Sequence, residues 1–322
     1  MSNKALKAVT AAAAAYTGIS AALGVFAYTQ VMERNATLFK KVADKVSADN
    51  NAKREVPFAS KAAESEKWLE QQTLEEYAMV NDRGQMLKGW LLPAENSKVF
   101  VFCSHGYRSS GRGEYGKFTK FYHENGINVF MVDHQAHGES EGDKIGFGYY
   151  EYQDCLKWLQ FIIDRFGSDI QIFLHGISMG CATVMLMTGD ARLPSNVKFT
   201  IADCGYTSAW NQFTHNLSSW HVPVNPTLFF ADIACRIKAG YSFRDADPIS
   251  KMKLASIPVL FIHGSADGFV PTRMGPENYN ACGSSDKKLV IIDGADHAES
   301  YKVNPDLYEE NVKEYIAKYI NM

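Results

Sequence analysis

The chain has 322 residues, of which 46% are apolar and 21% are charged, so it is long enough to bury one sizeable core. Its net charge of −3 provides no basic excess for a phosphate backbone, which argues against nucleic acid as a partner. The six cysteines form no Cys-x-x-Cys pair and no Cys/His cluster with zinc spacing, so we expect reduced thiols and no metal site.

The N-terminal region predicts a single membrane helix. Residues 10–31 carry no charge, and a stretch of that length is enough to cross a bilayer. We therefore expect a membrane-associated protein, although an alanine-rich soluble helix or a cleaved signal peptide would fit the same residues. Two lysines precede the span and four basic residues follow it closely, which mildly favours a cytoplasmic location for the rest of the chain and leaves the side of the membrane open.

A polar segment of mixed charge follows the span. Residues 32–72 predict a helical stalk that breaks before Pro57, and then a lead-in helix that runs through Trp68. We expect residues 1–72 to form the membrane anchor and stalk, and residues 73–322 to form the catalytic domain. Because a polar stalk would share no apolar surface with that domain, the sequence predicts that a chain lacking about the first 35 residues is soluble and active.

From residue 73 the pattern changes to that of an α/β domain. Alternation at 74–80 and an apolar run at 87–92 predict an antiparallel hairpin, and the solid apolar run at 99–103 predicts a strand covered on both faces. Strands and helices then alternate, which predicts a mostly parallel sheet with helices on both faces. The alternating elements are helix 114–124, strand 127–132, helix 149–166, strand 170–174, helix 178–188 and strand 197–202.

A helical cap insert interrupts this alternation at about residues 205–252. The insert is rich in aromatic residues and broken by prolines, and such an insert usually covers a site. We expect Trp210, Phe213 and Trp220 to form a lid whose bulk affects substrate preference more than stability. The sheet resumes afterwards with strand 259–262, helix 271–281, strand 288–292 and a closing helix at 305–320.

The segment Gly176-Ile177-Ser178-Met179-Gly180 joins a predicted strand to a predicted helix. A Gly-x-Ser-x-Gly sequence in that context predicts a nucleophile elbow, in which a sharp turn exposes the serine hydroxyl. Glycine is required at both positions for a steric reason, because a β-carbon at either position would crowd the turn. A serine hydroxyl is a poor nucleophile at neutral pH, so it needs a histidine base that a carboxylate holds in the right tautomer.

His297 and Asp267 are the candidates for base and acid. Each lies in a loop directly after a predicted strand, at the carboxyl edge of the sheet where open α/β folds bind ligands. Asp203, one strand earlier, is the competing acid, but its surroundings resemble a turn. Asp296 is expected to hold the loop beside the base. The other histidines near strand ends are expected to be structural, with His137 the one that could approach the pocket; they are His105, His134, His137, His175 and His263.

From about Thr73 to the C-terminus the sequence resembles the α/β-hydrolases of the serine esterase, lipase and peptidase type. The resemblance is carried by His105-Gly106 after the third strand, the segment 133–140 after the fourth, the elbow, and the segment 257–264 that leads to Asp267. The chain order Ser178, Asp267, His297 is also the order of that superfamily. In the fourth-strand loop Gln135-Ala136 replaces the more usual Arg-Gly. Residues 28–35 are similar to membrane-tethered bacterial members.

The resemblance implies an α/β-hydrolase fold with Ser178 as nucleophile, His297 as base and Asp267 as the acid that orients it. By motif position, the backbone N–H groups of Tyr107 and Met179 would form the oxyanion hole, whose donors stabilise the tetrahedral intermediate. No cofactor is implied.

The expected function is hydrolysis of a carboxylic ester through an acyl-enzyme, with a small-molecule or lipid-like ester as substrate. Peptidase, thioesterase and acyltransferase activities remain as alternatives, because one scaffold supports all of them. The insert carries few acidic residues that could hold a substrate ammonium, which argues against an aminopeptidase. A non-catalytic, membrane-tethered binding protein is the alternative of another class, and the oligomeric state stays open.

Overall fold

The computed structural model describes residues 3–36 and 59–321, so most of the expected stalk lies outside the described residues. Its centre is an eight-stranded sheet in the order β1-β2-β4-β3-β5-β6-β7-β8. Strand β2 pairs antiparallel with both β1 and β4, and the other five pairings are parallel, which confirms the expected mostly parallel α/β sheet. The strands are β1 (Glu75–Val80), β2 (Met86–Leu92), β3 (Val99–Ser104), β4 (Asn128–Val132), β5 (Gln171–Ile177), β6 (Val197–Asp203), β7 (Val259–Gly264) and β8 (Lys287–Ile292).

Hydrophobic patterning explains the place of each strand. Strands β3, β4 and β7 are buried along their whole length, as solid apolar runs require. Strand β1 alternates between exposed and half-buried side chains, and it forms one edge of the sheet. Charged residues Glu75 and Glu76 lie on that edge strand, where they discourage pairing with a second sheet.

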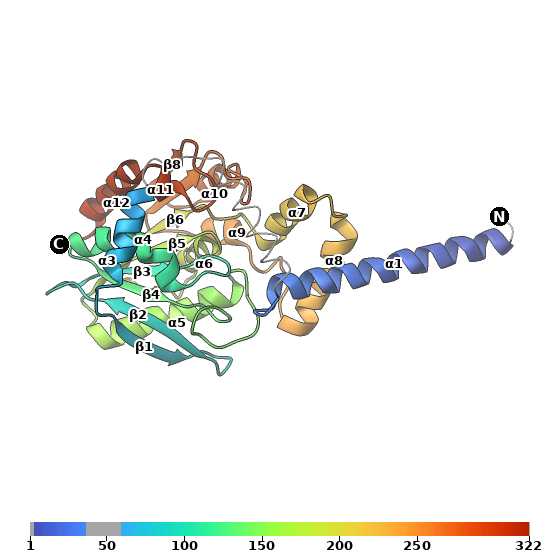
Figure 1. Ribbon diagram of the computed structural model, residues 1–322, viewed down its shortest axis with the longest axis horizontal. Helices are drawn as coiled ribbons and strands as arrows, with labels where there is room; N and C mark the ends of the chain where they lie inside the picture. The colour runs from blue at the N-terminus through green and yellow to red at the C-terminus, as the bar shows by residue number, and fades with distance from the viewer. Residues whose placement is uncertain (1–2, 37–58, 322) are drawn as a thin grey trace.

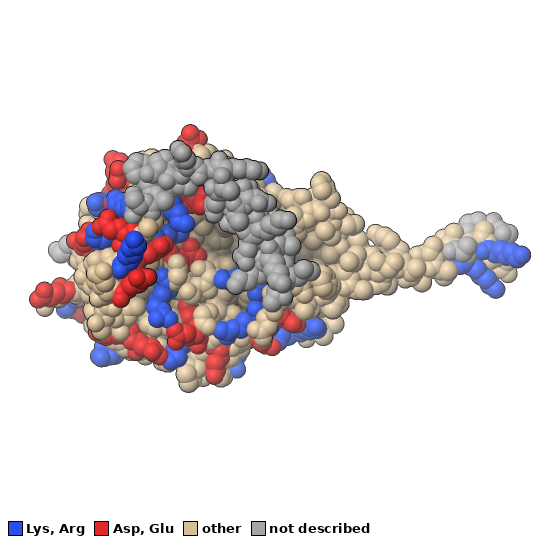
Figure 2. Space-filling view, viewed as in Figure 1, with Lys and Arg blue, Asp and Glu red and all other residues tan. Residues whose placement is uncertain are grey.

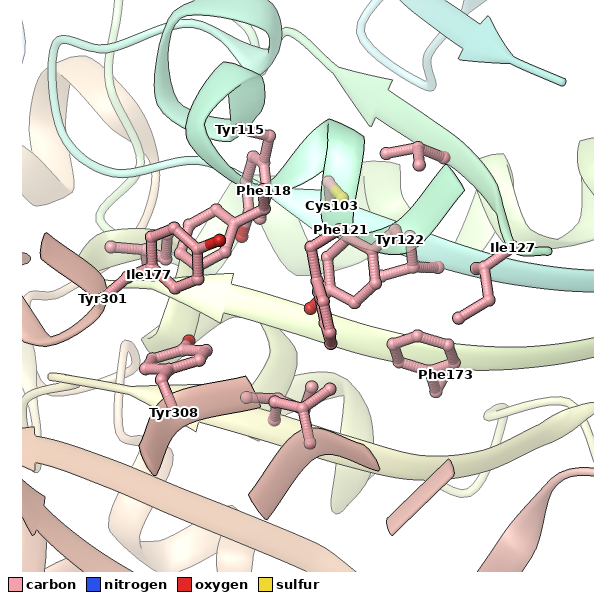
Figure 3. Packing of buried hydrophobic residues seen from close by; sticks show 14 of the residues in the cluster. Cys103, Tyr115, Phe118, Phe121, Tyr122, Ile127, Phe173, Ile177, Tyr301 and Tyr308 are labelled. Carbon is pink, nitrogen blue, oxygen red and sulfur yellow. The ribbon is translucent and has the colours of Figure 1, made fainter. Parts of the chain in front are cut away.

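Helices cover both faces of the sheet (Figure 1). One core lies under α3, α4 and α12, and Figure 3 shows rings of α4, such as Tyr115 and Phe118, gathered with Tyr301 and Tyr308 over β5. The opposite core lies under α5 and α6, with α9 and α10 beside them. These helices are α3 (Ala59–Leu69), α4 (Gly111–Glu124), α5 (Tyr149–Phe166), α6 (Met179–Thr188), α9 (Pro248–Met252), α10 (Met274–Ala281), α11 (Ser300–Val303) and α12 (Pro305–Tyr319).

The cap lies between β6 and β7 and contains α7 (Ala209–Ser219) and α8 (Val224–Ala239). The long helix α1 (Asn3–Met32) leaves the body beside α8 and projects away from it (Figure 1). Its last turns are not separate from the domain, because Tyr28 and Met32 are buried in the same apolar cluster as the cap. The expected stalk starts at residue 32, so the expectation that it shares no apolar surface with the domain is wrong for Met32.

The lead-in helix α3 also packs on the domain. Ala62 is buried in the core under α4, and the Ser65 hydroxyl donates a hydrogen bond to the Gly116 carbonyl at 2.6 Å. The packed unit thus includes residues from 59 onward as well as the end of α1.

Candidate active site

Ser178 lies in the turn between β5 and α6, with φ +57° and ψ −116°. A positive φ is costly for a residue with a β-carbon, so neighbouring contacts must hold the turn. The Ser178 N–H donates to the Asp203 carbonyl of β6 at 2.9 Å. A β-carbon on Gly176 would collide with the Gly180 carbonyl, and one on Gly180 would collide with the Ser104 carbonyl. The geometry is that of the expected elbow, and the two glycines are required by close backbone approach.

Three side chains from different loops form a continuous chain of hydrogen bonds. Nε2 of His297 lies 2.8 Å from Oγ of Ser178, and Nδ1 of His297 lies 2.8 Å from Oδ2 of Asp267. Oδ1 of Asp267 accepts from the backbone N–H groups of Phe269 at 3.0 Å and Val270 at 2.9 Å. The carboxylate is thereby held from both sides, and its remaining oxygen faces the imidazole. The structure brings together the three residues that the sequence singled out.

Electrostatics within this chain stabilise the charged forms of His297 and Asp267. Burial alone would lower the pKa of His297, but the Asp267 carboxylate outweighs burial and raises that pKa above its ordinary value. Burial would raise the pKa of Asp267, yet His297 and the hydrogen bond from buried His263 bring it well below its ordinary value. Asp267 is therefore ionised at neutral pH and stabilises a positive charge on His297.

Asp203, the competing acid, has other partners. Its Oδ2 accepts from the Tyr308 hydroxyl at 3.0 Å. Burial raises the pKa of Asp203 to about 6, with the charge of Lys117 opposing the shift. Asp203 lies at the carboxyl end of β6, but Asp267 is the acid in hydrogen-bond contact with the imidazole.

The histidines expected to be structural pin the loops at this edge. His105 Nε2 accepts from the His134 N–H at 3.0 Å, and His137 Nε2 accepts from the Arg108 N–H at 3.0 Å. His175 lies between two tyrosine hydroxyls, each 2.9 Å from a ring nitrogen. Burial lowers the pKa of His105, His134, His137 and His175. These four imidazoles therefore remain neutral and hold the loops through hydrogen bonds.

The departure at Gln135-Ala136 is accommodated structurally. Ala136 adopts a φ of +60°, the region where glycine costs least. The Gln135 carboxamide accepts from Arg83 Nε at 2.8 Å and donates to the Lys144 carbonyl at 2.7 Å. The contact with Arg83 ties the fourth-strand loop to the β1–β2 turn.

A pocket of about 330 Å³, partly open to solvent, lies in front of Ser178. Tyr107 and Met179, the candidate oxyanion-hole residues, both line it. Most of the other lining residues had no motif that could identify them, because they come from the cap and from loops; they are Phe147, Tyr206, Gln212, Asn216, Phe269 and Val270.

The three lid aromatics have different surroundings. Phe213 is buried against Phe147 and Phe243, with each pair of ring centroids 4.7 Å apart. Trp220 is 39% exposed, and Trp210 lies under the Arg244 guanidinium with 3.5 Å between Arg244 Cζ and the ring centroid. None of the three lines the pocket in front of Ser178.

One group of potential metal ligands overlaps the site. Among the described residues, Cys204, Asp267 and His297 have potential ligand atoms within 4.8 Å of one another. Asp267 and His297 are hydrogen-bonded to each other, and burial raises the pKa of the Cys204 thiol well above its ordinary value. All six cysteines are free and buried.

One part of the site had no sequence signal. The Tyr107 hydroxyl donates to the Val31 carbonyl at 2.7 Å, and the Arg108 guanidinium donates to the Gln30, Glu33 and Arg34 carbonyls at 2.9–3.1 Å. The loop that carries the candidate oxyanion donor is thus bound to the C-terminal end of α1.

The sequence matches a family model described as "Serine aminopeptidase, S33" over residues 95–228. Among curated proteins it is 29% identical to the uncharacterized protein YqkD of Bacillus subtilis, over 72% of this chain and 76% of that protein. It is 25% identical to the monoglyceride lipase of Mus musculus, over 68% of this chain and 82% of the lipase.

Among solved structures, an esterase of Pyrococcus furiosus superposes with a TM-score of 0.64 at 18% identity. The match covers 79% of this chain and 94% of the esterase. The eight-stranded, mostly parallel sheet with its covering helices agrees with the fold of this esterase. The chain has the α/β-hydrolase fold, and its residues 95–228 resemble the serine aminopeptidase family.

Proposed function

We propose that the protein is a serine hydrolase that cleaves carboxylic esters through an acyl-enzyme. The observation that carries the proposal is the continuous hydrogen-bonded chain from Ser178 through His297 to Asp267, which opens on a pocket. The likeness to esterases and a lipase supports a hydrolase of this kind.

In the proposed reaction, Oγ of Ser178 attacks the ester carbonyl while Nε2 of His297 takes its proton. The ionised Asp267 stabilises the imidazolium and keeps Nδ1 protonated. The N–H groups of Tyr107 and Met179 stabilise the negative oxygen of the tetrahedral intermediate. His297 then protonates the leaving alcohol, and water attacks the acyl-enzyme with the same histidine as base.

Ester substrates fit the cap better than peptides with a free amino terminus. An aminopeptidase needs an acidic group for the substrate ammonium, but the insert's acids are engaged elsewhere. Asp232 accepts from Ser242 and from Arg236, Asp245 accepts from the Ser242 N–H, and Asp247 caps α9. Peptide, thioester and acyl-transfer reactions on the same three residues are the alternatives.

We further propose that α1 anchors the enzyme in a membrane while residues 73–322, with the cap at 205–252, carry the chemistry. Helix α1 is long and apolar enough to span a bilayer, and its side chains are exposed from residue 9 to residue 19. Retention of α1 is favoured over cleavage as a signal peptide because its last turns are packed into the cap.

A fluorophosphonate probe tests the serine chemistry. We expect the purified wild type to be labelled, and Ser178→Ala to lose labelling while its circular dichroism spectrum stays unchanged. Ser219→Ala, at an exposed position of α7, is the matched control and should label like the wild type. A folded wild type that does not react would favour the non-catalytic, membrane-tethered binding protein.

A further inference from the structure

A second pocket, of about 380 Å³ including space open to solvent, lies between α1 and the cap helices. Its α1 wall consists of Ala27, Tyr28 and Val31, and the cap supplies the opposite wall. The lining is almost entirely apolar; the cap residues are Phe213, Asn216, Leu217, Trp220, Thr227, Leu228, Ala231 and Phe243.

Small residues let α1 approach the cap closely enough to close this pocket. Ser20, Gly24, Tyr28 and Met32 are buried and four residues apart, so they form one stripe along the helix. A β-carbon on Gly24 would lie 2.8 Å from the Thr227 carbonyl oxygen of α8, and it would also collide with the β-carbon of Phe230 on the same helix. Small residues at such spacing allow two helix backbones to come together.

The end of α1 is also fastened to the catalytic body. Arg108 and Tyr107 together satisfy four carbonyls at its C-terminal end, where a helix has unpaired acceptors and attracts positive charge. Arg34 donates to the Gly138 and Ser140 carbonyls at 2.6 Å each. The α1 wall of the pocket is therefore held at a fixed position relative to Ser178.

The second pocket adjoins the pocket in front of Ser178. Asn216 lines both of them. Two aromatic rings also lie between the pockets. Phe147 lines the first pocket and Phe213 lines the second, and their ring centroids are 4.7 Å apart. One side-chain layer thus separates the attacked carbonyl from an apolar space.

We propose that this second pocket binds the hydrocarbon chain of the ester substrate, and that helix α1 is one of its walls. The inference rests on the proposed ester hydrolysis and names the substrate class as esters with a long hydrocarbon chain. The chain passes Asn216 and the Phe147–Phe213 pair, while the carbonyl remains at Ser178. The anchor helix therefore contributes directly to substrate selection.

The position of the second pocket along α1 explains how a hydrocarbon chain would reach it from the membrane. A bilayer core about 30 Å thick needs about 20 helical residues, so a span that starts after Lys7 ends near Ala27. Because Ala27 lines the second pocket, the mouth of that pocket lies at the membrane surface. Phe229 and Ile237 of α8 are 56% and 78% exposed. Figure 2 shows that the stretch between the charged body and the lysines at the free end of α1 carries no charge on this face.

A chain-length series tests the proposal. The full-length protein in detergent is assayed with p-nitrophenyl acetate, butyrate, octanoate and laurate. For the wild type we expect kcat/KM to rise by up to about fourfold per buried methylene until the pocket is filled. Ala27→Phe, which fills the pocket from the α1 side, should abolish the rise with chain length. Ala22→Phe, at an exposed position of the same helix, is the matched control.

Leu217→Ala provides a second variant that enlarges the pocket from α7, so its expected effect is a shift of the preference toward laurate. A wild-type profile without dependence on chain length, or an Ala27→Phe profile that matches the wild type, would overturn the proposal. A co-purified lipid that Ala27→Phe loses without any change in profile would assign the pocket to a structural lipid instead. Absence of any ester hydrolysis and of probe labelling would contradict the proposed function itself.

Discussion

In the proposed mechanism His297 accepts a proton from Ser178 only while it is neutral, so protonation of this one imidazole is expected to control activity at low pH. Asp267 raises the pKa of His297 above the ordinary value of 6.5. We therefore expect kcat/KM to fall as the pH drops through a midpoint above 6.5, and to be constant above that midpoint until another group titrates.

Replacement of Asp267 tests this assignment. Asp267→Asn should lower turnover by up to about 10⁴-fold, because the amide favours the wrong imidazole tautomer. The low-pH limb should also move to lower pH, because burial lowers the pKa of His297 once the carboxylate is gone. A pH–rate profile of both proteins measures the two effects.

Asp203→Asn is the control, because Asp203 bonds to Tyr308 rather than to His297. We expect less than about a tenfold loss and an unchanged low-pH limb. If Asp203→Asn were the more damaging of the two substitutions, Asp203 would be the acid of the site.

At the scale of elements, the junction between α1 and α8 depends on one glycine. Gly24→Ala should destabilise the junction by about 1–3 kcal/mol, because the added methyl group has no room against α8. Gly18→Ala, on the same helix with no atom within 4 Å of the added carbon, should be neutral or stabilise α1 by up to about 1 kcal/mol. Thermal unfolding in one detergent compares the two variants.

Gly24→Ala is expected to lower the melting temperature, whereas Gly18→Ala is expected to leave it unchanged or raise it. Comparing the two variants therefore tests whether α1 packs on α8. Equal melting temperatures for the two alanine variants would mean that α1 does not pack on α8 in solution. In that case the second pocket would lack its α1 wall as well.

At the scale of the whole molecule, α1 is both an apolar extension and a packed part of the cap. We expect full-length protein to remain in the membrane fraction after a high-salt wash, because apolar burial is insensitive to screening. Recovery in the soluble fraction would contradict anchoring, and protease treatment of intact cells would report the side of the membrane.

The buried end of α1 changes what truncation should do. A chain lacking residues 1–35 loses Tyr28 and Met32, which are 1% and 0% exposed, and leaves their partners on α8 uncovered. We expect this truncation to aggregate or to melt at a lower temperature than a chain lacking residues 1–19, which keeps the packed turns. Size-exclusion chromatography and thermal unfolding compare them, and equal behaviour would show that the packed turns contribute nothing to stability.

Much of the catalytic domain follows from local sequence. The solid apolar runs specify central strands because both faces of a parallel sheet are covered, and the boundaries of α5 (Tyr149–Phe166) agree with the helical pattern. The elbow and the loops of Asp267 and His297 can be predicted because the carboxyl ends of parallel strands meet at one edge. The sequence favoured Asp267 over Asp203, which lies at the same edge, and the structure shows that Asp267 is the one in contact with His297.

The role of α1 was decided only by tertiary structure. An alanine-rich helix that is apolar on every side has no stripe to show which face is packed. The contacts that fasten it join Val31 to Tyr107 and Arg34 to Ser140, residues far apart in the chain, through backbone carbonyls that any sequence supplies. Local pattern therefore determines the sheet and the candidate site residues, whereas the walls of the pockets depend on which distant surfaces meet when the chain folds.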